Sequence, residues 1–425
     1  MKKKKAPLVR RMKEFVKTSV VWGPLDHNLF FTIIFLNVYG IIMVYSASYN
    51  NSITKNYSYF MNNQLKNVIF GFVIMIVASY VNYHRIVRLG WGWFWLLAAV
   101  AIIAALKTPL AHSELGATRW IKLGPVSFQA AEPIKAAIII FFAYYVSYWG
   151  LNRWYNQLLA CLLAIALLGF LFFFSNNLST VIVLFCICAV IILSSVKKPD
   201  RYVYFLLGLA LIIIAAIFVT VYLLMHQGAE NFRFVRIRAW LHPEEYAADE
   251  GLQAMQARYA IGAGGFWGKG LGQSLIKFKL SYSYNDFILA IICEELGVFG
   301  VIVMMTLFGY LLYRIYKIAQ NAWDIEGKVL AIGVFTQIAL QLLINVMVVT
   351  SVIPTTGVTL PFFSAGGTSV VFLLAELGMV LNVDKYAKER RFFEEAERHV
   401  AQMEQRGGIG AAGWRRRLDS ARTRR

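Results

Sequence analysis

The chain has 425 residues, of which 59% are hydrophobic and only 15% are charged, and its mean hydropathy is +0.58. This composition excludes an ordinary soluble domain and predicts an all-α integral membrane protein that crosses the bilayer many times. The formal net charge of +19 does not indicate nucleic-acid binding, because the basic residues gather in the two tails and in the short connections between apolar runs.

The N-terminal tail, 1–26, opens with the basic stretch MKKKKAPLVRRMKEFVK. No short apolar segment with a small-residue cleavage site follows it, and the first hydrophobic run is long enough to span a membrane. We therefore expect a cytoplasmic tail and a membrane anchor, not a cleaved signal peptide. The cysteines lie inside apolar runs, where small core residues are usual, and their placement predicts neither a disulfide nor a zinc site. They are Cys161, Cys186, Cys188 and Cys293.

Ten apolar runs follow, each near the length needed to cross about 30 Å of hydrocarbon. They lie at about 28–47, 66–82, 89–106, 128–148, 157–174, 178–195, 202–225, 285–313, 329–351 and 364–383. With the N-terminus inside, every second connection is cytoplasmic, and these connections carry basic residues such as Arg88, Arg153, Lys198 and Arg314. The sequence thus predicts about ten transmembrane helices with both termini in the cytoplasm.

Two of the outward connections, 107–127 and 226–284, are too long to be plain turns. The second lies between the seventh and eighth predicted helices and is expected to be an ordered extracellular loop. Its segment NFRFVRIRAWLHPEEY predicts a short interfacial helix with aromatic anchors such as Trp240 and anion contacts such as Arg236.

The last outward connection, TSVIPTTGVTLPFFSAGGTS, has prolines and glycines that break a helix at membrane depth. Because irregular backbone at that depth is tolerated where it lines a cavity, we expect a polar cleft. Its expected walls are this connection, the stretch 107–135 and the stretch 226–286. The membrane domain would end at 385. The tail, 386–425, continues as a charged helical pattern expected along the cytoplasmic face or against a partner, then a GGIGAAG linker and a basic end.

Charged residues at the outer side are the candidates for chemistry. Glu132 and Lys135 are three residues apart on a predicted helix and can pair. That pair is either an ion pair that lowers the cost of placing both charges in the membrane or part of a substrate site. Arg119 and Trp120 precede it at interface depth; an anchor explains the tryptophan, and a ligand with phosphate and sugar would use both.

Asp286 lies where a glycine-rich loop, GAGGFWGKGLG, gives way to an apolar helix. A carboxylate in the first turn of a helix compensates the helix dipole and needs no further function. Inside a membrane protein it is also a candidate functional group. The loop lacks the spacing of a nucleotide site, and its glycines favour a flexible backbone whose amides approach a bulky headgroup.

Several ordered motifs resemble the SEDS family of cell-wall glycosyltransferases, the FtsW, RodA and SpoVE proteins. They are MVYSAS at 43–48, GATRWIKLGPVSFQAAEPIK, GLQAMQARYAIGAGGFWGKGLG, DFILAIICEELGVFG and PTTGVTLPFFSAGGTS. The resemblance spans about 25–385. It implies that lipid II, an undecaprenyl-pyrophosphate-linked disaccharide pentapeptide, is polymerised at the outer face of the bacterial plasma membrane.

In that resemblance the essential aspartate falls on Asp286, as the base that deprotonates the acceptor 4-hydroxyl in an inverting transfer. Arg119, Lys135 and Arg236 become candidates to hold pyrophosphate. The remaining candidate substrate contacts are Trp120, Glu132, Gln253, Lys269 and Ser364. No cofactor is expected beyond a possible divalent cation, Mg or Mn, for which the sequence shows no dedicated cage.

The resemblance also implies partners: a class B penicillin-binding protein transpeptidase, other divisome proteins and membrane lipids. The sequence departs from the family pattern at three places, so no family role is carried over to them. They are SYSYN at 281–285, Asn177, which replaces an acid, and His242. MVYSAS and the long basic tails favour the division branch. An elongation polymerase, a lipid II transporter and a division scaffold remain as alternatives.

Overall fold

The computed structural model describes residues 24–48, 59–196 and 239–405, apart from short gaps in the last two ranges, together with a few isolated positions outside them. Its helices are α2 (His27–Ser48), α3 (Tyr59–Tyr80), α4 (Tyr83–Val87), η1 (Leu89–Gly92), α5 (Trp93–Ala105), α6 (Ala131–Trp149), α7 (Trp154–Ser175), α8 (Leu178–Ser195), α11 (Glu250–Gly264), η2 (Ile276–Phe278), α12 (Ile288–Asn321), α13 (Ile325–Val349) and α14 (Thr368–Gln405). Its strands are β1 (Ala111–Glu114), β2 (Ala117–Leu123) and β3 (Val126–Gln129).

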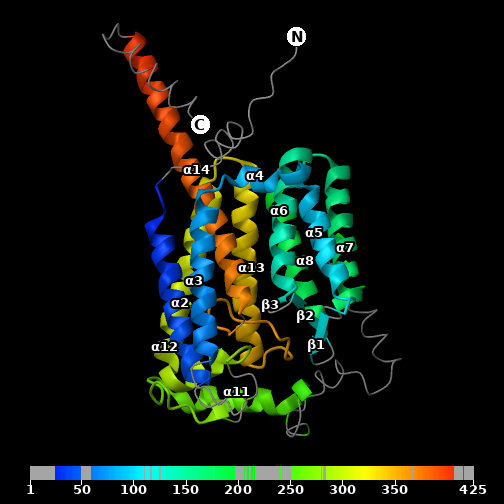
Figure 1. The fold of residues 1–425 in the computed structure, drawn as a ribbon, viewed down its shortest axis with the longest axis vertical. Coiled ribbons are helices and arrows are strands. Elements are labelled where there is room, and N and C mark those ends of the chain that lie inside the picture. Colours follow the sequence, from blue (N-terminus) through cyan, green and yellow to red (C-terminus); the bar gives the residue numbers. More distant parts are fainter. Residues whose placement is uncertain are drawn as a thin grey trace.

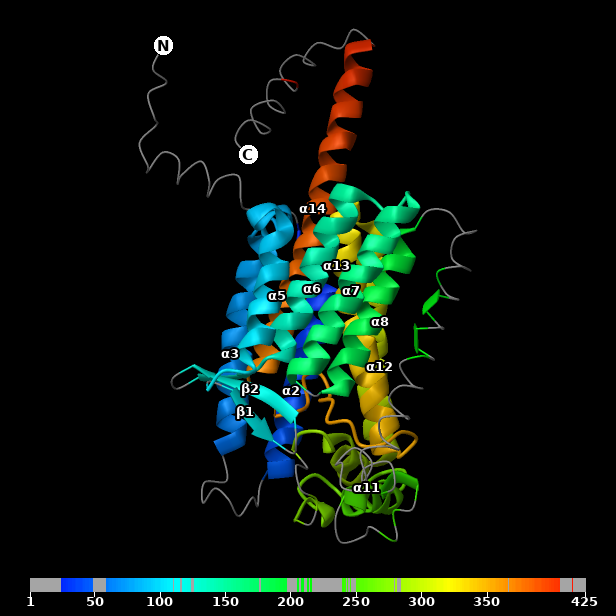
Figure 2. The same ribbon diagram turned by 90° about the vertical axis from the view of Figure 1, so that its right-hand side faces the viewer.

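The long helices run side by side as one bundle (Figure 1). At one end lie α11 and the strands, and at the other lie α4 and the protruding half of α14 (Figures 1 and 2). Within the described residues, α2, α3, α7, α8, α12 and α13 are long and apolar enough to cross a membrane, and α5 is a shorter apolar helix. The helical membrane class is confirmed. The predicted run 202–225 lies almost wholly outside the described residues, so the number ten stays a prediction.

The outward connection 107–127 contains a small antiparallel sheet that sequence analysis did not predict. Its order is β1-β2-β3, and Trp120 of β2 pairs with His112 and with Gln129. The segment ATRWIKL contains the β-branched and aromatic residues Thr118, Trp120 and Ile121, which favour strands. Because β3 ends at Gln129 and α6 begins at Ala131, the sheet leads directly into the helix that carries Glu132 and Lys135.

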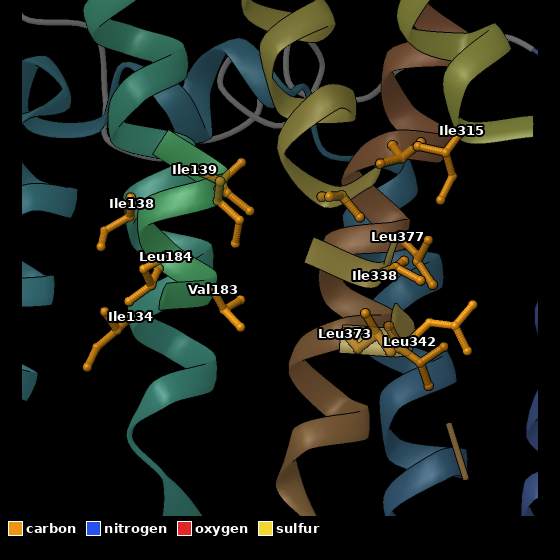
Figure 3. Close-up of a cluster of buried hydrophobic side chains, with 14 of the residues drawn as sticks. Ile134, Ile138, Ile139, Val183, Leu184, Ile315, Ile338, Leu342, Leu373 and Leu377 are labelled. Atoms are coloured by element: carbon orange, nitrogen blue, oxygen red, sulfur yellow. The ribbon is translucent and has the colours of Figure 1, made fainter. Parts of the chain in front are cut away.

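Close helix packing holds the bundle together. A Cβ atom at Gly378 of α14 would lie 2.5 Å from the Met75 carbonyl oxygen of α3, and one at Gly71 would lie 2.6 Å from Leu374. Small residues of this kind let membrane helices approach closely. The aliphatic core between the helices is drawn in Figure 3, with α6 and α8 on one side and α12, α13 and α14 on the other: Ile134, Ile138, Ile139, Val183, Leu184, Ile315, Ile338, Leu342, Leu373 and Leu377.

The helix α12 is interrupted at Gly297, whose φ of 65° and ψ of −165° are not helical. An interruption leaves backbone groups without their helical partners, which is costly in a membrane. The glycine-rich loop supplies new ones. The amides of Lys269 and Gly270 donate to the carbonyls of Glu294 and Glu295, each at 2.9 Å, and the amides of Val298 and Phe299 donate to the carbonyls of residues 265 and 266, each at 3.1 Å.

Glycine is required at this junction because backbone meets backbone. A Cβ at Gly297 would lie 2.4 Å from the Gly268 nitrogen, and a Cβ at Gly268 would lie 2.2 Å from the Glu295 carbonyl oxygen. Gly268 also has a positive φ of 76°. We expected these loop amides to approach a substrate headgroup; those of residues 269 and 270 instead complete the hydrogen bonding of α12.

Ion pairs cross-link the helices at the opposite end of the bundle. Arg314 of α12 pairs with Asp26, and Arg88 lies 2.8 Å from Glu326 of α13. The Nε2 atom of His84 lies 2.6 Å from Asp324. Burial disfavours the charged form of Asp324, but hydrogen bonds from His84, Gly327 and Tyr83 outweigh it and hold the pKa of Asp324 below its usual value. Two arginines of the predicted cytoplasmic connections, Arg88 and Arg314, are thus paired with acids.

The charged C-terminal pattern continues the last apolar helix without a break. The helix α14 has 38 residues and runs through 385, where we placed a boundary. Its second half projects away from the bundle (Figures 1 and 2) and does not lie along the cytoplasmic face, and the alternative, that it contacts a partner, stays a prediction. Between 379 and 405 the sequence has no glycine or proline, and i,i+4 ion pairs such as Lys388–Asp384 at 2.6 Å support the exposed part.

The Gly297→Ala substitution should destabilise the protein. The glycine-only backbone conformation costs about 1–3 kcal/mol for other residues, and the new methyl group overlaps the loop backbone. The matched control is Gly309→Ala in the same helix, where a Cβ meets nothing within 4 Å, and which should be neutral or slightly stabilising. The measurement is thermal unfolding in mild detergent. Equal melting temperatures for the two variants would contradict the loop–helix junction.

Candidate active site

Asp286 precedes the helix that sequence analysis associated with it. The first residue of α12 is Ile288, and its N-cap is Phe287, which makes no side-chain capping bond. Asp286 is therefore outside the first helical turn, where a carboxylate compensates the helix dipole best. Its side chain is half-buried, whereas residues 287–292 after it are buried. This position argues against the explanation that Asp286 serves only to compensate the helix dipole.

The backbone at Asp286 is held in place by hydrogen bonds that three successive carbonyl groups, those of residues 284–286, accept. The side-chain amide of Asn345, on α13, donates to the carbonyls of Asp286 and Val358, each at 2.9 Å. The Ser364 hydroxyl donates to the Asn285 carbonyl at 2.9 Å, and the Ala365 amide donates to the Tyr284 carbonyl at 2.9 Å. We call these contacts the carbonyl clamp. It joins the segment of Asp286 to the loop between α13 and α14.

Ser364, a candidate substrate contact, is a member of this clamp. Its hydroxyl accepts a hydrogen bond from the Leu360 amide at 2.7 Å and donates to Asn285, and the residue is only 3% exposed. The single hydroxyl proton is therefore already used. The structure places Ser364 as a residue that positions Asp286 and shapes the loop.

Glu132 and Lys135 form the predicted pair, with 2.7 Å between the carboxylate and the ammonium, and both side chains are buried. A third ionisable side chain, Glu376, joins them from α14. The Glu376 carboxyl interacts electrostatically with both, and it accepts a hydrogen bond from Gln337 of α13 at 2.8 Å. The pair thus belongs to a polar cluster that links α6, α13 and α14 inside the bundle.

Two adjoining pockets lie beside this cluster and share Glu132, Gln341, Thr359 and no other polar residue. One of them reaches Gln129, Lys135, Asn177, Ser179, Thr180, Gly357 and Val358, and the other reaches Leu360, Pro361, Phe362, Ser364 and Ser369. Residues of the stretch 107–135 and of the last outer loop therefore line two small pockets, of about 20 and 30 Å³, and the larger polar cleft stays a prediction. No described residue of the third predicted wall, 226–286, lines either pocket. That stretch contacts the last loop through the carbonyl clamp and through the Trp240 indole, which donates a hydrogen bond to the Ser351 carbonyl at 2.9 Å.

The other predicted residues are more widely spread. Trp120 is half-buried on β2, opposite Gln129, and Arg119 is its neighbour on the same strand. Gln253 is half-buried on α11, away from the two pockets. Arg236 and His242 lie outside the described residues.

Lys269 has a structural partner. Its ammonium lies 2.7 Å from the carboxylate of Glu294, which is fully buried and also accepts from the Ser274 hydroxyl and the Leu275 amide. The neighbouring Glu295 accepts from the Ser46 hydroxyl of α2 and lies 3.6 Å from Lys277. These contacts tie the loop 269–277 to α12. The role of Lys269 is thus to anchor the loop that precedes Asp286.

Sequence analysis missed three amides on α13. Gln337, Gln341 and Asn345 are spaced four residues apart, so they share one face of an otherwise apolar helix. Their exposures are 0%, 6% and 0%. Polar side chains repeated at helical spacing inside a transmembrane run indicate a functional or packing surface, and this signal was present in the sequence.

A divalent cation finds no ready-made site here. Among the described residues, no group of three or more His, Cys, Asp or Glu side chains is arranged to hold a metal ion. The carboxylate of Glu132 is occupied by Lys135.

Removing one member of the buried pair should cost more than removing a surface pair. Lys135→Met leaves Glu132 buried without its counter-charge, and we expect a loss of about 3–5 kcal/mol in the free energy of unfolding. The double variant Glu132→Gln/Lys135→Met should recover most of it. Arg398→Met, which breaks the exposed pair with Glu394, should cost less than about 1 kcal/mol. Unfolding by denaturant in detergent measures these values, and a double variant no better than Lys135→Met would argue against a coupled pair.

Comparison with known proteins places this site in a family. The FtsW/RodA/SpoVE family model, described as cell cycle protein, matches residues 26–389. The probable peptidoglycan glycosyltransferase FtsW of Bacillus subtilis (strain 168) is 31% identical, over 85% of this chain and 91% of its own. Stage V sporulation protein E of the same organism is 33% identical, over 84% and 96%.

Solved structures share the fold. A chain from a structure described as "Structural coordination of polymerization and crosslinking by a peptidoglycan synthase complex" has a TM-score of 0.70 at 22% identity and covers 86% of this chain and 99% of its own. The rod shape determining protein RodA of Thermus thermophilus has a TM-score of 0.61 at 22% identity, with coverages of 86% and 98%. The family model and the relatives together show that the chain belongs to the FtsW/RodA/SpoVE family.

Proposed function

We propose that this protein is a peptidoglycan glycosyltransferase that polymerises lipid II at the outer face of the plasma membrane, with Asp286 as the general base. Relatives that match most of the chain are named as probable glycosyltransferases of this kind. The observation that carries the assignment of Asp286 is the carbonyl clamp. It holds the backbone of a half-buried carboxylate against the loop whose other residues line the two pockets.

In the proposed reaction the Asp286 carboxylate takes the proton of the acceptor sugar's 4-hydroxyl. The oxygen forms a bond to the anomeric carbon of the donor, and the bond from that carbon to the lipid pyrophosphate breaks. Attack from the face opposite the leaving group inverts the anomeric centre. A general base must be held within hydrogen-bond reach of the proton that it removes, and a clamped backbone meets that need better than a mobile loop.

The leaving pyrophosphate gains negative charge as its bond breaks, so it needs cations at the site. Arg119, on the strand before α6, and Arg236, in the outer loop, remain the candidates for this role. Lys135 is a poor candidate, because Glu132 already lies 2.7 Å from its ammonium and Glu376 also faces it.

We further propose that the protein works with a class B penicillin-binding protein and other divisome proteins in septum synthesis, with both termini in the cytoplasm. The similar structure described as coordinating polymerisation and crosslinking supports a transpeptidase partner. The names of the FtsW relatives support the division role. The basic residues gathered near α4 and the α12–α13 turn support the orientation.

The Asp286→Asn variant tests the base directly, because it keeps the shape of the side chain and removes its basicity. With the transpeptidase partner bound, wild type should form glycan strands from labelled lipid II, and Asp286→Asn should lose at least about 100-fold in rate. Its melting temperature should stay near that of wild type.

The matched control is Glu245→Gln, which removes an exposed acid of the same outer loop and should leave the rate unchanged. Normal polymerisation by Asp286→Asn would refute its role as base. No polymerisation by wild type, combined with movement of lipid II across vesicle membranes, would replace the enzyme with a transporter.

A further inference from the structure

Glu376, the third member of the polar cluster, is buried without a counter-charge of its own. Its exposure is 1%. Lys135 is the basic residue that acts on it electrostatically, but the Lys135 ammonium already lies 2.7 Å from Glu132. No ion pair joins Glu376 to a basic side chain in the described part of the chain. The cluster therefore holds two carboxyl groups and a single ammonium group.

The hydrogen bonding of Glu376 lacks a donor. The Gln337 side-chain amide donates to one carboxyl oxygen at 2.8 Å. The other carboxyl oxygen and the side-chain carbonyl oxygen of Gln337 are buried and have no hydrogen-bond partner among the described residues. A carboxylate only accepts hydrogen bonds, whereas a carboxylic acid also donates one. A proton on Glu376 would supply the missing donor to this contact.

The surroundings of Glu376 give little stabilisation to a negative charge. Neither of the two small pockets beside the cluster is lined by Glu376, so these pockets place no water against its carboxyl. The stretch of α3 that packs on this part of α14, 69–77, has no ionisable side chain. On α12, Arg314 is paired with an acid outside the cluster, and Tyr310 and Tyr313 are exposed. A carboxylate in such surroundings is so costly that the group takes up a proton instead.

We propose that Glu376 is a proton-binding site in the membrane interior, which holds a proton at neutral pH and joins α14 to α13 as a neutral carboxylic acid. The proton comes from water, and the O–H bond on the carboxyl is the only bond that forms. With this proton the cluster carries one negative and one positive charge, those of Glu132 and Lys135, and is neutral as a whole.

Loss of the proton would act on the candidate active site through α13. Gln337 and Asn345 lie on the same face of this helix, about two turns apart, and Asn345 donates to the Asp286 carbonyl. An ionised Glu376 would place an unpaired negative charge against that face and weaken the contacts that hold Asp286. Polymerisation should therefore decline at a pH high enough to remove the proton, and Glu376→Gln should lack this decline. This consequence rests on the proposed function, whereas the protonation does not.

Infrared spectroscopy of the full-length protein in detergent tests the protonation directly, because the carbonyl stretch of a carboxylic acid is separate from the bands of carboxylates and amides. At neutral pH, the difference between wild type and Glu376→Gln should contain an acid band that shifts in deuterated water. Glu376→Leu, which also lacks the carboxyl, should give the same band in an independent variant. The matched control is Glu394→Gln in the exposed half of α14, which should give no acid band.

Thermal unfolding supplies a second measurement. Glu376→Gln keeps the shape and the neutrality of the protonated acid, so its melting temperature at neutral pH should equal or exceed that of wild type. A glutamate in an unfolded chain titrates at about pH 4.3, so above that pH wild type takes up a proton when it folds. Its melting temperature should therefore fall with rising pH relative to that of Glu376→Gln.

The outcomes separate the inference from the proposed function. A difference spectrum without an acid band overturns the proton site, because Glu376 is then a carboxylate. A melting temperature of Glu376→Gln well below that of wild type at neutral pH contradicts it as well. Identical alkaline declines in wild type and Glu376→Gln overturn the link to Asp286. An acid band in a protein whose Asp286→Asn variant polymerises normally leaves the proton site standing and refutes the proposed base.

Discussion

The outer end of the molecule depends on the interruption of α12 at Gly297. The glycine-rich loop forms the backbone hydrogen bonds that the interrupted helix lacks. A straight helix of 34 residues would be roughly 51 Å long, well beyond the hydrocarbon thickness. The break divides it into a segment of ordinary spanning length and a short buried segment that begins just after Asp286. Because the freed backbone groups bond to residues 265–270, the loop and the helix form one unit.

The same unit is secured by buried carboxylates. Glu294 and Glu295 have 0% exposure, and their partners come from the loop and from α2. Buried charges of this kind are tolerated only when they are paired and hydrogen-bonded, and here the contacts link α12 to the loop that precedes it and to α2, which is far away in sequence. The carbonyl clamp then joins this unit to α13 and the last outer loop. Asp286 lies between two sets of fixed contacts, which is the preorganisation that a general base requires.

Three amides on one face of α13 connect this helix to the polar interior of the bundle. On α13, Gln337 and Asn345 satisfy other protein groups, whereas Gln341 faces the pockets. The first two therefore act on the structure, one through Glu376 and one through the clamp. The same interior holds the Glu132 counter-charge of Lys135, which makes Lys135 a poor candidate for contacting a pyrophosphate.

The sequence by itself determined the membrane class, the approximate positions of the long apolar helices, the Glu132–Lys135 pair and the family, because hydropathy, helical spacing and ordered motifs are local properties. The tertiary structure decided the rest. It showed that Lys269 and Ser364 hold the loops near Asp286, that residues 111–129 form a sheet, and that α14 continues through 385. It also showed that Glu376 interacts electrostatically with Lys135, and that the Asn345 amide donates a hydrogen bond to the Asp286 carbonyl. Such pairings join residues far apart in the chain, and no local pattern encodes which of many polar side chains will meet when helices pack.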